Sequence, residues 1–435
     1  MEYCDKISYR YYELENPVLV IYNYVNEATY YYDSISAELL NAILTRNEIA
    51  MNRIIGENEL DAETVEDFIN ETNVLLNVSQ MKTNMNECFE MEIIDNGETI
   101  SQICNEMYRN SILYRFHIDI TGKCNYRCVH CYHTFEKYSE DLLSETNIEA
   151  LFEKLYKLGV FILTISGGEP FIRKDMLKIL ECAKKYDFVI QILTNGYFLN
   201  EKMIQEIANS NVCKLSFSYY GSENTHNKIT NKKDSYIKLM NAIDLCIKYN
   251  ISYELKFILL NDNVDEFNEY VNLCNRLGLR VLFEPCLIPK LDGDNSNFHH
   301  KLGFEKYKEF MYSHMQYFYN GTDITLYSDK CINCSAGKYG LYCDHTGKIY
   351  PCVSYREYLG EWKDVKKIWN ESERLKEIRD RKHEQFLSFN KYSFCKYCYQ
   401  ICPGLSLCEN GNSLECNNSG CLVAQVIESV DNEVN

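Results

Sequence analysis

The chain has 435 residues, 25% of them charged and 46% hydrophobic, which is typical of a folded protein with two or three domains rather than a disordered one. The formal net charge of −18 disfavours nucleic acid as a partner, because an acidic surface repels phosphate backbones. No apolar run reaches the roughly 18 residues of a membrane span, and MEYCDKISYR at the start contains no secretory signal. We therefore expect a cytoplasmic protein without a membrane partner.

Residues 1–85 predict a small α+β module. NPVLVIYNYVNEATYYYD indicates a two-stranded hairpin around Asn26 and Glu27. SISAELLNAILTRN and AETVEDFINETNVLL indicate two or three helices. Residues 86–112 form a less regular linker to the next part of the chain.

Residues 113–300 alternate between strand-like and helix-like segments. Amphipathic stretches such as IEALFEKLYKLG, with Ile148, Leu151 and Leu155 at helical spacing, separate segments rich in β-branched and aromatic residues. Six such units imply parallel strands with right-handed crossovers, and we expect an α/β fold, a partial (β/α)6 TIM-like barrel with its chemistry at the C-terminal strand ends. The predicted strands are 114–121, 161–166, 188–194, 212–219, 253–260 and 279–285.

The cysteines are numerous and unevenly placed. Of the 21, three lie at 124–131 and ten at 331–421, and the remaining eight are isolated. In a chain without an export signal, dense cysteines indicate metal or cluster binding more than disulfides. Residues 301–330 are a bridging segment, and 331–435 are expected to form a cysteine-rich C-terminal domain.

The first predicted strand leads into TGKCNYRCVHCYHTF, in which Cys124, Cys128 and Cys131 are spaced to hold three irons of a cubane cluster and leave the fourth iron open. A zinc site is the alternative that spacing alone leaves open. The position at the end of a strand argues against zinc, because a barrel enzyme keeps its active site there. The second strand ends in Gly167-Gly168-Glu169-Pro170, where two glycines let the backbone approach a ligand closely.

These two motifs, CxxxCxxC after the first strand and GGEP after the second, resemble the radical SAM superfamily. The resemblance implies that S-adenosylmethionine (SAM) binds the open iron through its amino and carboxylate groups. The GGEP motif would then cradle the amino group. It also implies reductive cleavage of SAM to a 5′-deoxyadenosyl radical that abstracts a substrate hydrogen. His130 departs from the aromatic residue that the family more often has there.

Other residues are assigned to SAM by position within the family pattern. Asn195 and Ser218 would meet the ribose or the carboxylate, Lys256 the carboxylate, and Tyr132 would flank the adenine. For each of these residues, a structural polar or packed aromatic role is the alternative.

The tail resembles the SPASM extension of radical SAM enzymes. Its mark is a cysteine, a glycine 9–15 residues later and another cysteine, and Cys334, Gly347 and Cys352 fit this pattern. The resemblance implies two auxiliary [4Fe–4S] clusters, making three in all, with zinc knuckles as the alternative. The later cysteines depart from the family spacing, because Cys402 comes after three residues and Cys408 after five.

That departure leaves individual cluster ligands open. For the first auxiliary cluster we expect Cys334, Cys352 and Cys408, with either Cys331 or Cys343. For the second we expect Cys395, Cys398, Cys402 and Cys421, with Cys416 as the alternate.

The front module resembles the winged-helix recognition elements of enzymes that modify ribosomally made peptides, with YYYDSISAELLNAI at the strand-to-helix passage. Such modules bind a leader peptide as an added strand, and a structural cap is the alternative. The leading hypothesis is a maturase of ribosomally made peptides (RiPPs) that acts on a precursor of leader plus core and installs a crosslink. A thioether from a substrate cysteine is the preferred product.

The alternatives are a carbon–carbon, carbon–oxygen or oxidative product, formylglycine maturation of a sulfatase, and a non-enzymatic zinc scaffold or cluster-based redox sensor. Flavodoxin or ferredoxin is the expected type of electron donor.

Overall fold

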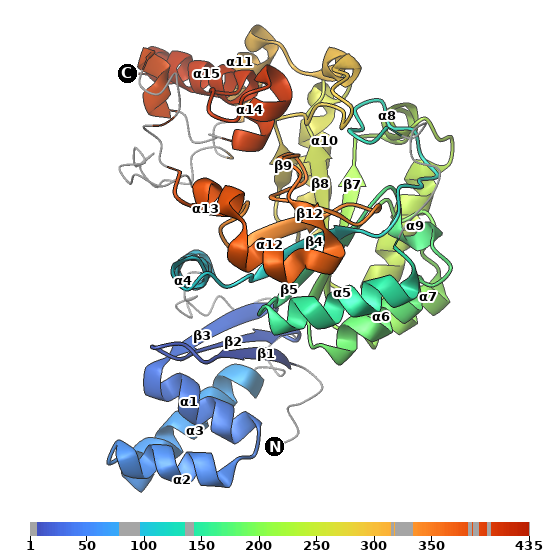
Figure 1. Ribbon diagram of the computed structural model, residues 1–435. Helices are drawn as coiled ribbons and strands as arrows, with labels where there is room; N and C mark the ends of the chain where they lie inside the picture. Colours follow the sequence, from blue (N-terminus) through green and yellow to red (C-terminus); the bar gives the residue numbers. More distant parts are fainter. Residues whose placement is uncertain are drawn as a thin grey trace.

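The computed structural model describes residues 7–77, 96–134, 143–314, 317, 334–381, 385, 391–397 and 402–434. The strands form a three-stranded sheet of order β1-β2-β3 and a nine-stranded sheet of order β12-β11-β10-β4-β5-β6-β7-β8-β9. The small sheet and its helices, drawn in blue, lie at one end of the molecule (Figure 1).

The front module is a β-sheet covered on one face by helices. The expected hairpin is confirmed, since β2 pairs antiparallel with β3 from Val18 opposite Asp33 to Asn23 opposite Ala28. A third strand that the sequence did not predict, β1, pairs with the other side of β2. The elements are β1 (Ile7–Tyr12), β2 (Val18–Asn23), β3 (Ala28–Asp33), α1 (Ser34–Leu44), α2 (Glu48–Glu57) and α3 (Ala62–Asn77).

The other face of this sheet is packed against the rest of the chain. Val18 and Val20 of β2 share one hydrophobic cluster with Ile103 and Met107 of α4 (Asn96–Arg109) and with Phe161 at the start of a barrel strand. Burial of this apolar surface fixes the module to the N-terminal ends of the barrel strands.

Hydrogen bonds reinforce this junction. Ser8 Oγ donates to Asp187 Oδ1 at 2.7 Å, and Tyr12 OH donates to the carbonyl of Gly159 at 2.9 Å. Both acceptors lie two or three residues before strands of the large sheet, Asp187 before Val189 and Gly159 before Ile162. The front module therefore lies at the end of the barrel opposite to the expected site.

The six predicted strands of the barrel are confirmed, and each pairs in parallel with the next. They are β4 (Arg115–Asp119), β5 (Ile162–Ser166), β6 (Val189–Thr194), β7 (Val212–Tyr219), β8 (Tyr253–Ile258) and β9 (Leu282–Glu284). The α-helices are α5 (Glu145–Lys157), α6 (Met176–Lys185), α7 (Glu201–Ala208), α8 (Glu223–Thr230), α9 (Ser235–Lys248), α10 (Phe267–Leu277) and α11 (Phe304–Ser313). Short 3-10 helices are η2 (Pro170–Ile172), η3 (Val264–Glu266) and η4 (Ser296–His300).

The cysteine-rich tail extends the barrel sheet. Strand β10 (Gly340–Cys343) pairs in parallel with β4, and β11 (Lys348–Tyr350) and β12 (Gly360–Glu361) follow in antiparallel order. This pairing brings the tail beside the strand that leads into the cysteine motif. The remaining elements are η6 (Trp362–Asp364), α12 (Val365–Glu371), α13 (Glu373–Arg379), η8 (Ser393–Tyr397), α14 (Pro403–Asn410) and α15 (Asn418–Val434).

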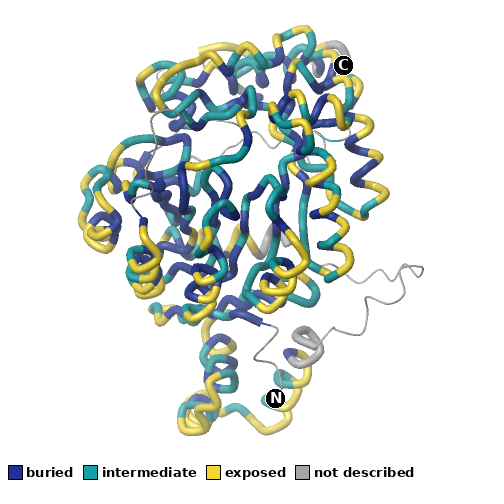
Figure 2. Tube along the Cα trace, turned by 90° about the vertical axis from the view of Figure 1, so that its right-hand side faces the viewer, coloured by how far each residue is buried: buried dark blue, intermediate teal, exposed yellow. Residues whose placement is uncertain are grey.

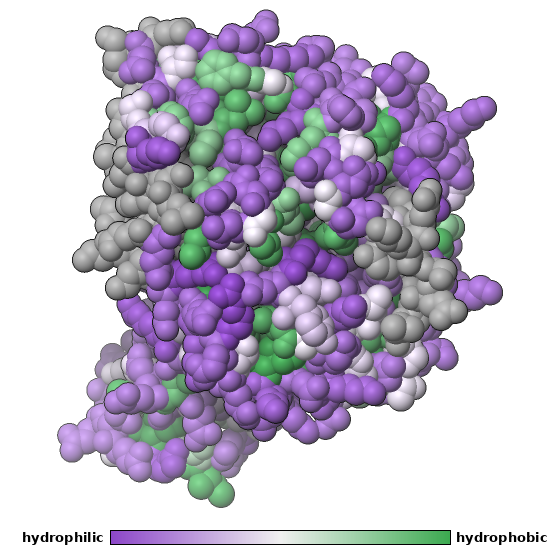
Figure 3. Space-filling view, turned by 45° about the horizontal axis from the view of Figure 1, so that its top comes forward, coloured by the Kyte–Doolittle hydropathy of each residue, from purple (hydrophilic) through white to green (hydrophobic). Residues whose placement is uncertain are grey.

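The most deeply buried residues of the barrel lie in the strands of the large sheet. Buried residues run through its strands, whereas the surrounding helices alternate buried and exposed turns (Figure 2). Hydrophilic residues cover most of the face in Figure 3, with apolar residues in small, separate patches. Within the described ranges, no helix has the length and apolarity that crossing a bilayer requires.

Candidate active site

The cysteine motif follows β4 and lines a cavity at the C-terminal ends of the barrel strands. Cys124, Cys128 and Cys131 all border this space of about 250 Å³. Burial raises the pKa of the Cys124 thiol to about 12 and that of Cys131 to about 11. Cys131 raises the pKa of Cys124, and both raise that of Cys128, so a bound cation would favour the three thiolates together.

The donor set fits a cluster better than a single ion. Structural zinc needs about four ligands around one point. Across the part of the chain that the structure describes, no group of three or more His, Cys, Asp or Glu side chains is arranged to hold one metal ion. A cubane cluster places each thiolate on a different iron, and three partly buried thiols around one cavity suit that requirement.

The GGEP turn forms one wall of the cavity through its backbone. The amide of Gly168 donates to the Thr121 carbonyl at 2.9 Å, and the amide of Glu169 donates to the Lys123 carbonyl at 2.9 Å. Gly167 has φ +139°, and a Cβ on it would overlap the Thr121 carbonyl oxygen. Only glycine therefore lets this turn pack against the loop that carries the cysteines.

We expect Gly168→Ala to weaken SAM binding about tenfold or more. A Cβ at Gly168 would overlap the Lys123 carbonyl oxygen, and such overpacking costs about 1–3 kcal/mol. Gly303→Ala is the matched control, because nothing lies within 4 Å of a Cβ there. Equilibrium binding of SAM to both reconstituted variants checks this, and unchanged affinity in Gly168→Ala would contradict the assignment of the turn.

Glu169 is fully buried and serves the framework of the site. Its carboxylate accepts hydrogen bonds from the Asn195 amide at 2.7 Å, Thr194 Oγ1 at 2.8 Å and the Phe171 amide at 3.0 Å. Burial nevertheless raises its pKa to about 7. This carboxylate ties the end of β5 to the end of β6.

The structure brings most of the predicted SAM residues to the cavity. Tyr132, Gly167, Gly168, Asn195 and Ser218 line it. Other residues that line the cavity were not predicted. Most of them could have been found from the sequence, because they lie at strand ends or inside the cysteine motif. These are Tyr126, His130, His133, Ser166, Leu193, Thr194, Tyr220 and Ile258.

Three predicted residues do not line that cavity. Glu169 and Pro170 are both buried and are not among its lining residues. Lys256 lies 3.3 Å from Glu254 on the same strand, and Glu254 also accepts from Ser216 at 2.5 Å and Gln191 at 3.2 Å. Lys256 thus belongs to a polar network on the inner side of the sheet.

The tail brings four of its cysteines together. The Cys352 thiol is near enough to raise the pKa of Cys334, Cys402 and Cys408, and Cys402 also raises that of Cys334 and Cys408. Cys408 Sγ donates to the carbonyl of Ser354 at 3.2 Å, two residues from Cys352. Cys402 was expected with the second cluster, so its position here differs from that expectation.

The other predicted tail ligands that the structure describes are Cys343, Cys395, Cys416 and Cys421, and none of them is among the thiols that affect the pKa of this group. Cys343 is buried in β10 within the main hydrophobic core, where its thiol donates to the carbonyl of Asp344 at 3.5 Å. Cys395 lies on η8 and Cys421 on α15, two elements that pack against each other, and the Cys416 carbonyl accepts from Asn410 at 2.9 Å. Cys331 and Cys398 lie outside the described residues.

Tyr132 lies near a cysteine of each group. Burial chiefly raises the pKa of its phenol, and nearby Asp119, Cys131 and Cys352 raise it further. Asp119 is buried at the end of β4 and accepts from Tyr342 OH at 2.5 Å, across the junction with β10. The pairing of β4 with β10 therefore sets the cavity beside the cysteine group of the tail.

Comparisons with known proteins agree with this geometry. The model of the radical SAM superfamily matches residues 118–274, and that of the SPASM iron–sulfur cluster-binding domain matches 334–399. The AdoMet-dependent heme synthase of Methanosarcina barkeri is 21% identical over 66% of this chain and 89% of its own length. The sporulation killing factor maturation protein SkfB of Bacillus subtilis is 26% identical over 37% of this chain and 39% of its own length.

Solved structures share the fold along nearly the whole chain. Streptococcus suis SuiB bound to SAM superposes with a TM-score of 0.62 at 14% identity, covering 96% of this chain and 99% of that one. SuiB bound to its precursor peptide SuiA gives 0.60 at 15% identity, covering 96% and 98%. The cofactors are [4Fe–4S] clusters and SAM. The chain belongs to the radical SAM superfamily, as an enzyme with a SPASM domain.

Proposed function

We propose that the protein is a peptide maturase that abstracts hydrogen from a ribosomally made precursor and installs a crosslink. The observation that carries this proposal is that Tyr132 lines the cavity of the first cysteine group and also lies near Cys352 of the tail. A peptide held at the cavity mouth would lie beside both groups. The names of two similar proteins support a peptide substrate, since SkfB is a maturation protein and SuiB was crystallised with a precursor peptide.

The residues of the cavity have separable tasks in this proposal. When bound, the cluster and SAM supply the radical chemistry. Cys124, Cys128 and Cys131 hold the cluster, and the backbone of Gly167 and Gly168 receives the amino end of SAM. Asn195 and Ser218, at the ends of the adjacent strands β6 and β7, orient the rest of the SAM molecule. The backbone N–H of Asn195 is held in place by its hydrogen bond to Glu169.

The inner side of the sheet offers a binding surface for the peptide. Glu254 and Lys256 present opposite charges there, and their side chains are 16% and 47% exposed. Gln191 and Ser216 add hydrogen-bonding groups to the same network. We infer that polar side chains or backbone groups of the core peptide are held at this surface.

A thioether is the product that we favour. Its formation joins a cysteine sulfur to a carbon, and the peptide loses two hydrogen atoms overall. A second group of cysteines beside the cavity supports this choice, because an auxiliary cluster with an open iron would bind a substrate thiolate. A carbon–carbon or carbon–oxygen crosslink is the alternative product.

Mass spectrometry of the treated precursor tests the proposal. The holoenzyme is incubated with SAM, a reductant and the precursor, and the product is then alkylated with iodoacetamide. A peptide that has lost two hydrogens and one alkylatable cysteine supports the thioether. Loss of two hydrogens with every cysteine still alkylated favours the alternative crosslinks, and an aldehyde on a sulfatase peptide favours formylglycine maturation.

The front module is proposed as the leader-binding part. Strand β3 is an edge strand of its sheet, and an extended peptide can pair with such an edge. A groove of about 540 Å³ lies between the end of β3, the start of α1 and the exposed side of α4. Its lining residues are Tyr31, Tyr32, Asp33, Ser36, Gln102, Asn105, Glu106 and Arg109.

We expect the double variant Ser36→Trp/Asn105→Trp to weaken leader binding about tenfold or more, because two indoles would fill the groove. Fluorescence anisotropy with a labelled leader peptide measures this effect. Asn52→Trp on an exposed position of α2 is the matched control. Equal leader affinity in all three proteins would mean that the leader binds elsewhere, while SAM cleavage should be the same in each.

A further inference from the structure

We propose that Glu284, the last residue of β9, is the base that takes the thiol proton of the substrate cysteine during crosslinking. This inference rests on the proposed function, since it concerns the same reaction and the same cavity. Glu284 belongs to no cluster or SAM motif, so its role follows from its position in the sheet.

Glu284 lies on the face of the large sheet that borders the cavity. In the parallel register it is opposite Ile258 of β8, and Ile258 lines the cavity of the cysteine loop. Side chains of residues paired in this way point to the same face of a sheet. The neighbouring Phe283 packs against the hydrophobic core on the opposite face. Glu284 and Ile258 both end their strands, so the Glu284 carboxylate is on the C-terminal rim, one strand from the cavity wall.

One hydrogen bond positions the carboxylate and leaves it able to accept a proton. The backbone amide of Cys286 donates to Glu284 Oε1 at 3.2 Å. Within the described part of the chain this is the one hydrogen bond that the side chain accepts, and solvent reaches the residue. Oε2 is therefore available to a group of the substrate.

The surroundings of Glu284 favour proton uptake. Although solvent reaches one side of it, desolvation by the protein around it raises the pKa of its carboxyl, and this effect exceeds the lowering by the Cys286 amide and by Lys256 of β8. Burial raises the pKa of the Cys286 thiol to about 12, so that thiol stays neutral. Lys301 and Glu409, which lie near Cys286, form an ion pair at 3.9 Å and offset each other. A carboxyl with a raised pKa is a better base near neutral pH.

The other carboxylates at this rim and on the inner face of the sheet are engaged. Glu169 is fully buried and accepts three hydrogen bonds from the framework. Asp119 is also fully buried, accepts from Tyr342 OH at 2.5 Å and has the rings of two histidines 3.5 and 3.6 Å away. Glu254 accepts from two side chains of adjacent strands. Of these four carboxylates, Glu284 is the exposed one, so a substrate thiol can reach it.

The end of β9 also lies close to the cysteines of the tail. Cys286, two residues beyond Glu284, is near enough to Cys402 for the Cys402 thiol to raise its pKa. Cys402 is one of the tail cysteines near Cys352. A substrate cysteine at Glu284 would thus lie near both the cavity and the group of tail cysteines.

Crosslinking requires such a base. SAM supplies the 5′-deoxyadenosyl radical, which takes one hydrogen atom from a peptide carbon. The S–H bond of the substrate cysteine breaks with its proton going to Glu284 and its electron pair staying on sulfur, and the sulfur–carbon bond forms. One electron is left over and reduces an oxidised auxiliary cluster of the tail. The peptide loses a hydrogen atom, a proton and an electron, which equals the two hydrogen atoms of a thioether.

The test is Glu284→Gln in the holoenzyme with SAM, dithionite and the precursor. We expect SAM cleavage to continue while thioether formation at pH 7 falls about 100-fold or more, the range that loss of a general base gives. With a precursor whose carbon-bound hydrogens are deuterium, 5′-deoxyadenosine should still acquire deuterium. Mass spectrometry measures both products, and continued SAM cleavage shows that the variant is folded.

The pH profile distinguishes a base from a structural residue. Product formation by the wild type should fall as the pH drops through the raised pKa of Glu284, because the protonated carboxyl accepts no proton. In Glu284→Gln the rate should rise about tenfold from pH 7 to pH 8, below the usual thiol pKa of about 8.5, as solvent takes over deprotonation. Glu284→Asp should keep part of the product. The affinity for the precursor, measured by isothermal titration, should be the same in all three proteins.

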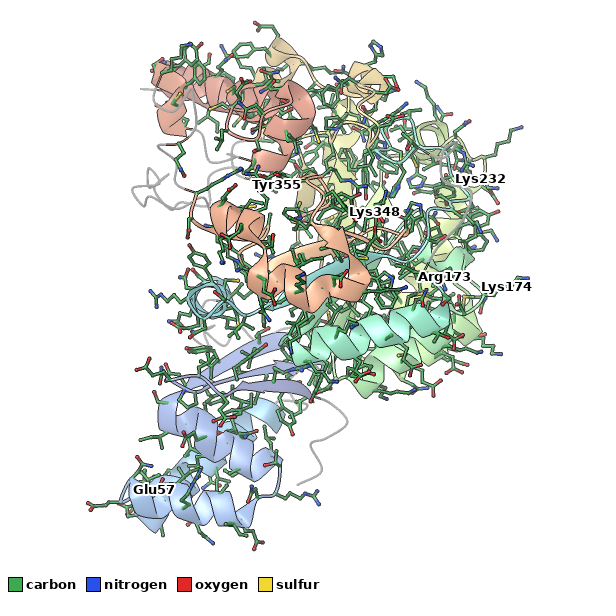
Figure 4. All side chains as sticks on the ribbon, in the orientation of Figure 1. Glu57, Arg173, Lys174, Lys232, Lys348 and Tyr355 are labelled. Atoms are coloured by element: carbon green, nitrogen blue, oxygen red, sulfur yellow. The ribbon has the colours of Figure 1, made fainter. Side chains whose placement is uncertain are left out.

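Glu361→Gln on β12 is the matched control. Glu361 is exposed and lies opposite Lys348 of β11 (Figure 4), in the strand at the other end of the large sheet from β9. It should keep the product yield and the pH profile of the wild type. An equal loss in this variant would overturn the assignment of Glu284.

The remaining outcomes separate this inference from the proposed function. A thioether made equally well by Glu284→Gln would overturn the base alone. A loss of product that does not recover with rising pH, or that comes with weaker precursor binding, would also overturn it, because Glu284 would then hold the peptide or the fold. A wild-type product in which every cysteine is still alkylated would refute the thioether and, with it, the thiol base.

Discussion

Replacing Cys124, Cys128 and Cys131 together by alanine abolishes SAM cleavage to the level of a protein-free control. The three thiols line one cavity and are the ligands proposed there for the SAM-binding cluster, so no other described residue replaces them at that position. Single alanine variants should give the same result, because residues that act as one unit are not additive. Chromatographic detection of 5′-deoxyadenosine after addition of dithionite and SAM checks the prediction.

The control for this experiment is Cys246→Ala. Cys246 is fully buried in α9 within the hydrophobic core, apart from both groups of cysteines. Its loss should lower stability by no more than about 1–3 kcal/mol while SAM cleavage continues. Cleavage that persisted in the triple variant would refute the assignment of the cysteine loop.

The barrel could be predicted from sequence because its signals are local. Each of the six strands is a run of β-branched or aromatic residues, and each is followed by a helix of clear periodicity. The first two cluster motifs lie directly after strands, so the ends of neighbouring parallel strands bring them together. That rule predicted the fold and the meeting of the two motifs at one edge of the sheet, whereas the assignment of a SAM-binding cluster came from the resemblance of the motifs to the radical SAM superfamily.

The sheet extension could not be predicted in the same way. Strands β10, β11 and β12 have only four, three and two residues, too few to show a period. Their position depends on pairing with β4, more than 200 residues earlier in the chain, which no local pattern records. Strand β1 is a different case, because its six residues include Ile7 and three tyrosines and it pairs with the next strand, so the sequence carried a local signal that was not used.

The role of Glu169 shows a second limit. A carboxylate next to two glycines suggests contact with a cationic amine. In the structure both carboxylate oxygens accept hydrogen bonds from residues at the end of β6 or from the Phe171 amide in the same turn. The residue therefore orients Asn195 and the turn. Whether a carboxylate faces a ligand or the framework depends on side-chain direction, which the motif does not encode.

The grouping of the tail cysteines shows a third limit, because spacing alone separated Cys402 from Cys334. In the structure Cys402 immediately precedes α14, where its thiol accepts from the Leu405 amide at 3.4 Å as the helix cap. In this position its thiol is near Cys352. A helix start, which the sequence marks by Pro403, thus changes which cysteines meet.

Replacing Cys402 and Cys408 by serine therefore removes one auxiliary cluster and product formation while sparing SAM cleavage. Iron content should fall from about twelve to about eight atoms per chain, since each cubane cluster holds four. Cys343→Ser is the matched control, because Cys343 is buried in the core of β10 and should keep all the iron. Iron and sulfide analysis, 5′-deoxyadenosine yield and mass spectrometry of the peptide together measure the three effects.

The outcomes of this comparison separate two ligand sets. If Cys343→Ser loses about four irons, the first auxiliary cluster includes Cys343 and the burial of its thiol in β10 does not reflect the loaded protein. If Cys402→Ser alone loses product while Cys395→Ser does not, Cys402 serves the group beside Tyr132. If Cys402→Ser and Cys395→Ser reduce product equally, Cys402 belongs to the second cluster, as first expected. Its partners would then include Cys395 on η8 and Cys421 on α15, two elements that pack against each other.

Full product in both variants would mean that the tail clusters do not take part in the chemistry. The reason for preferring a thioether would then be lost.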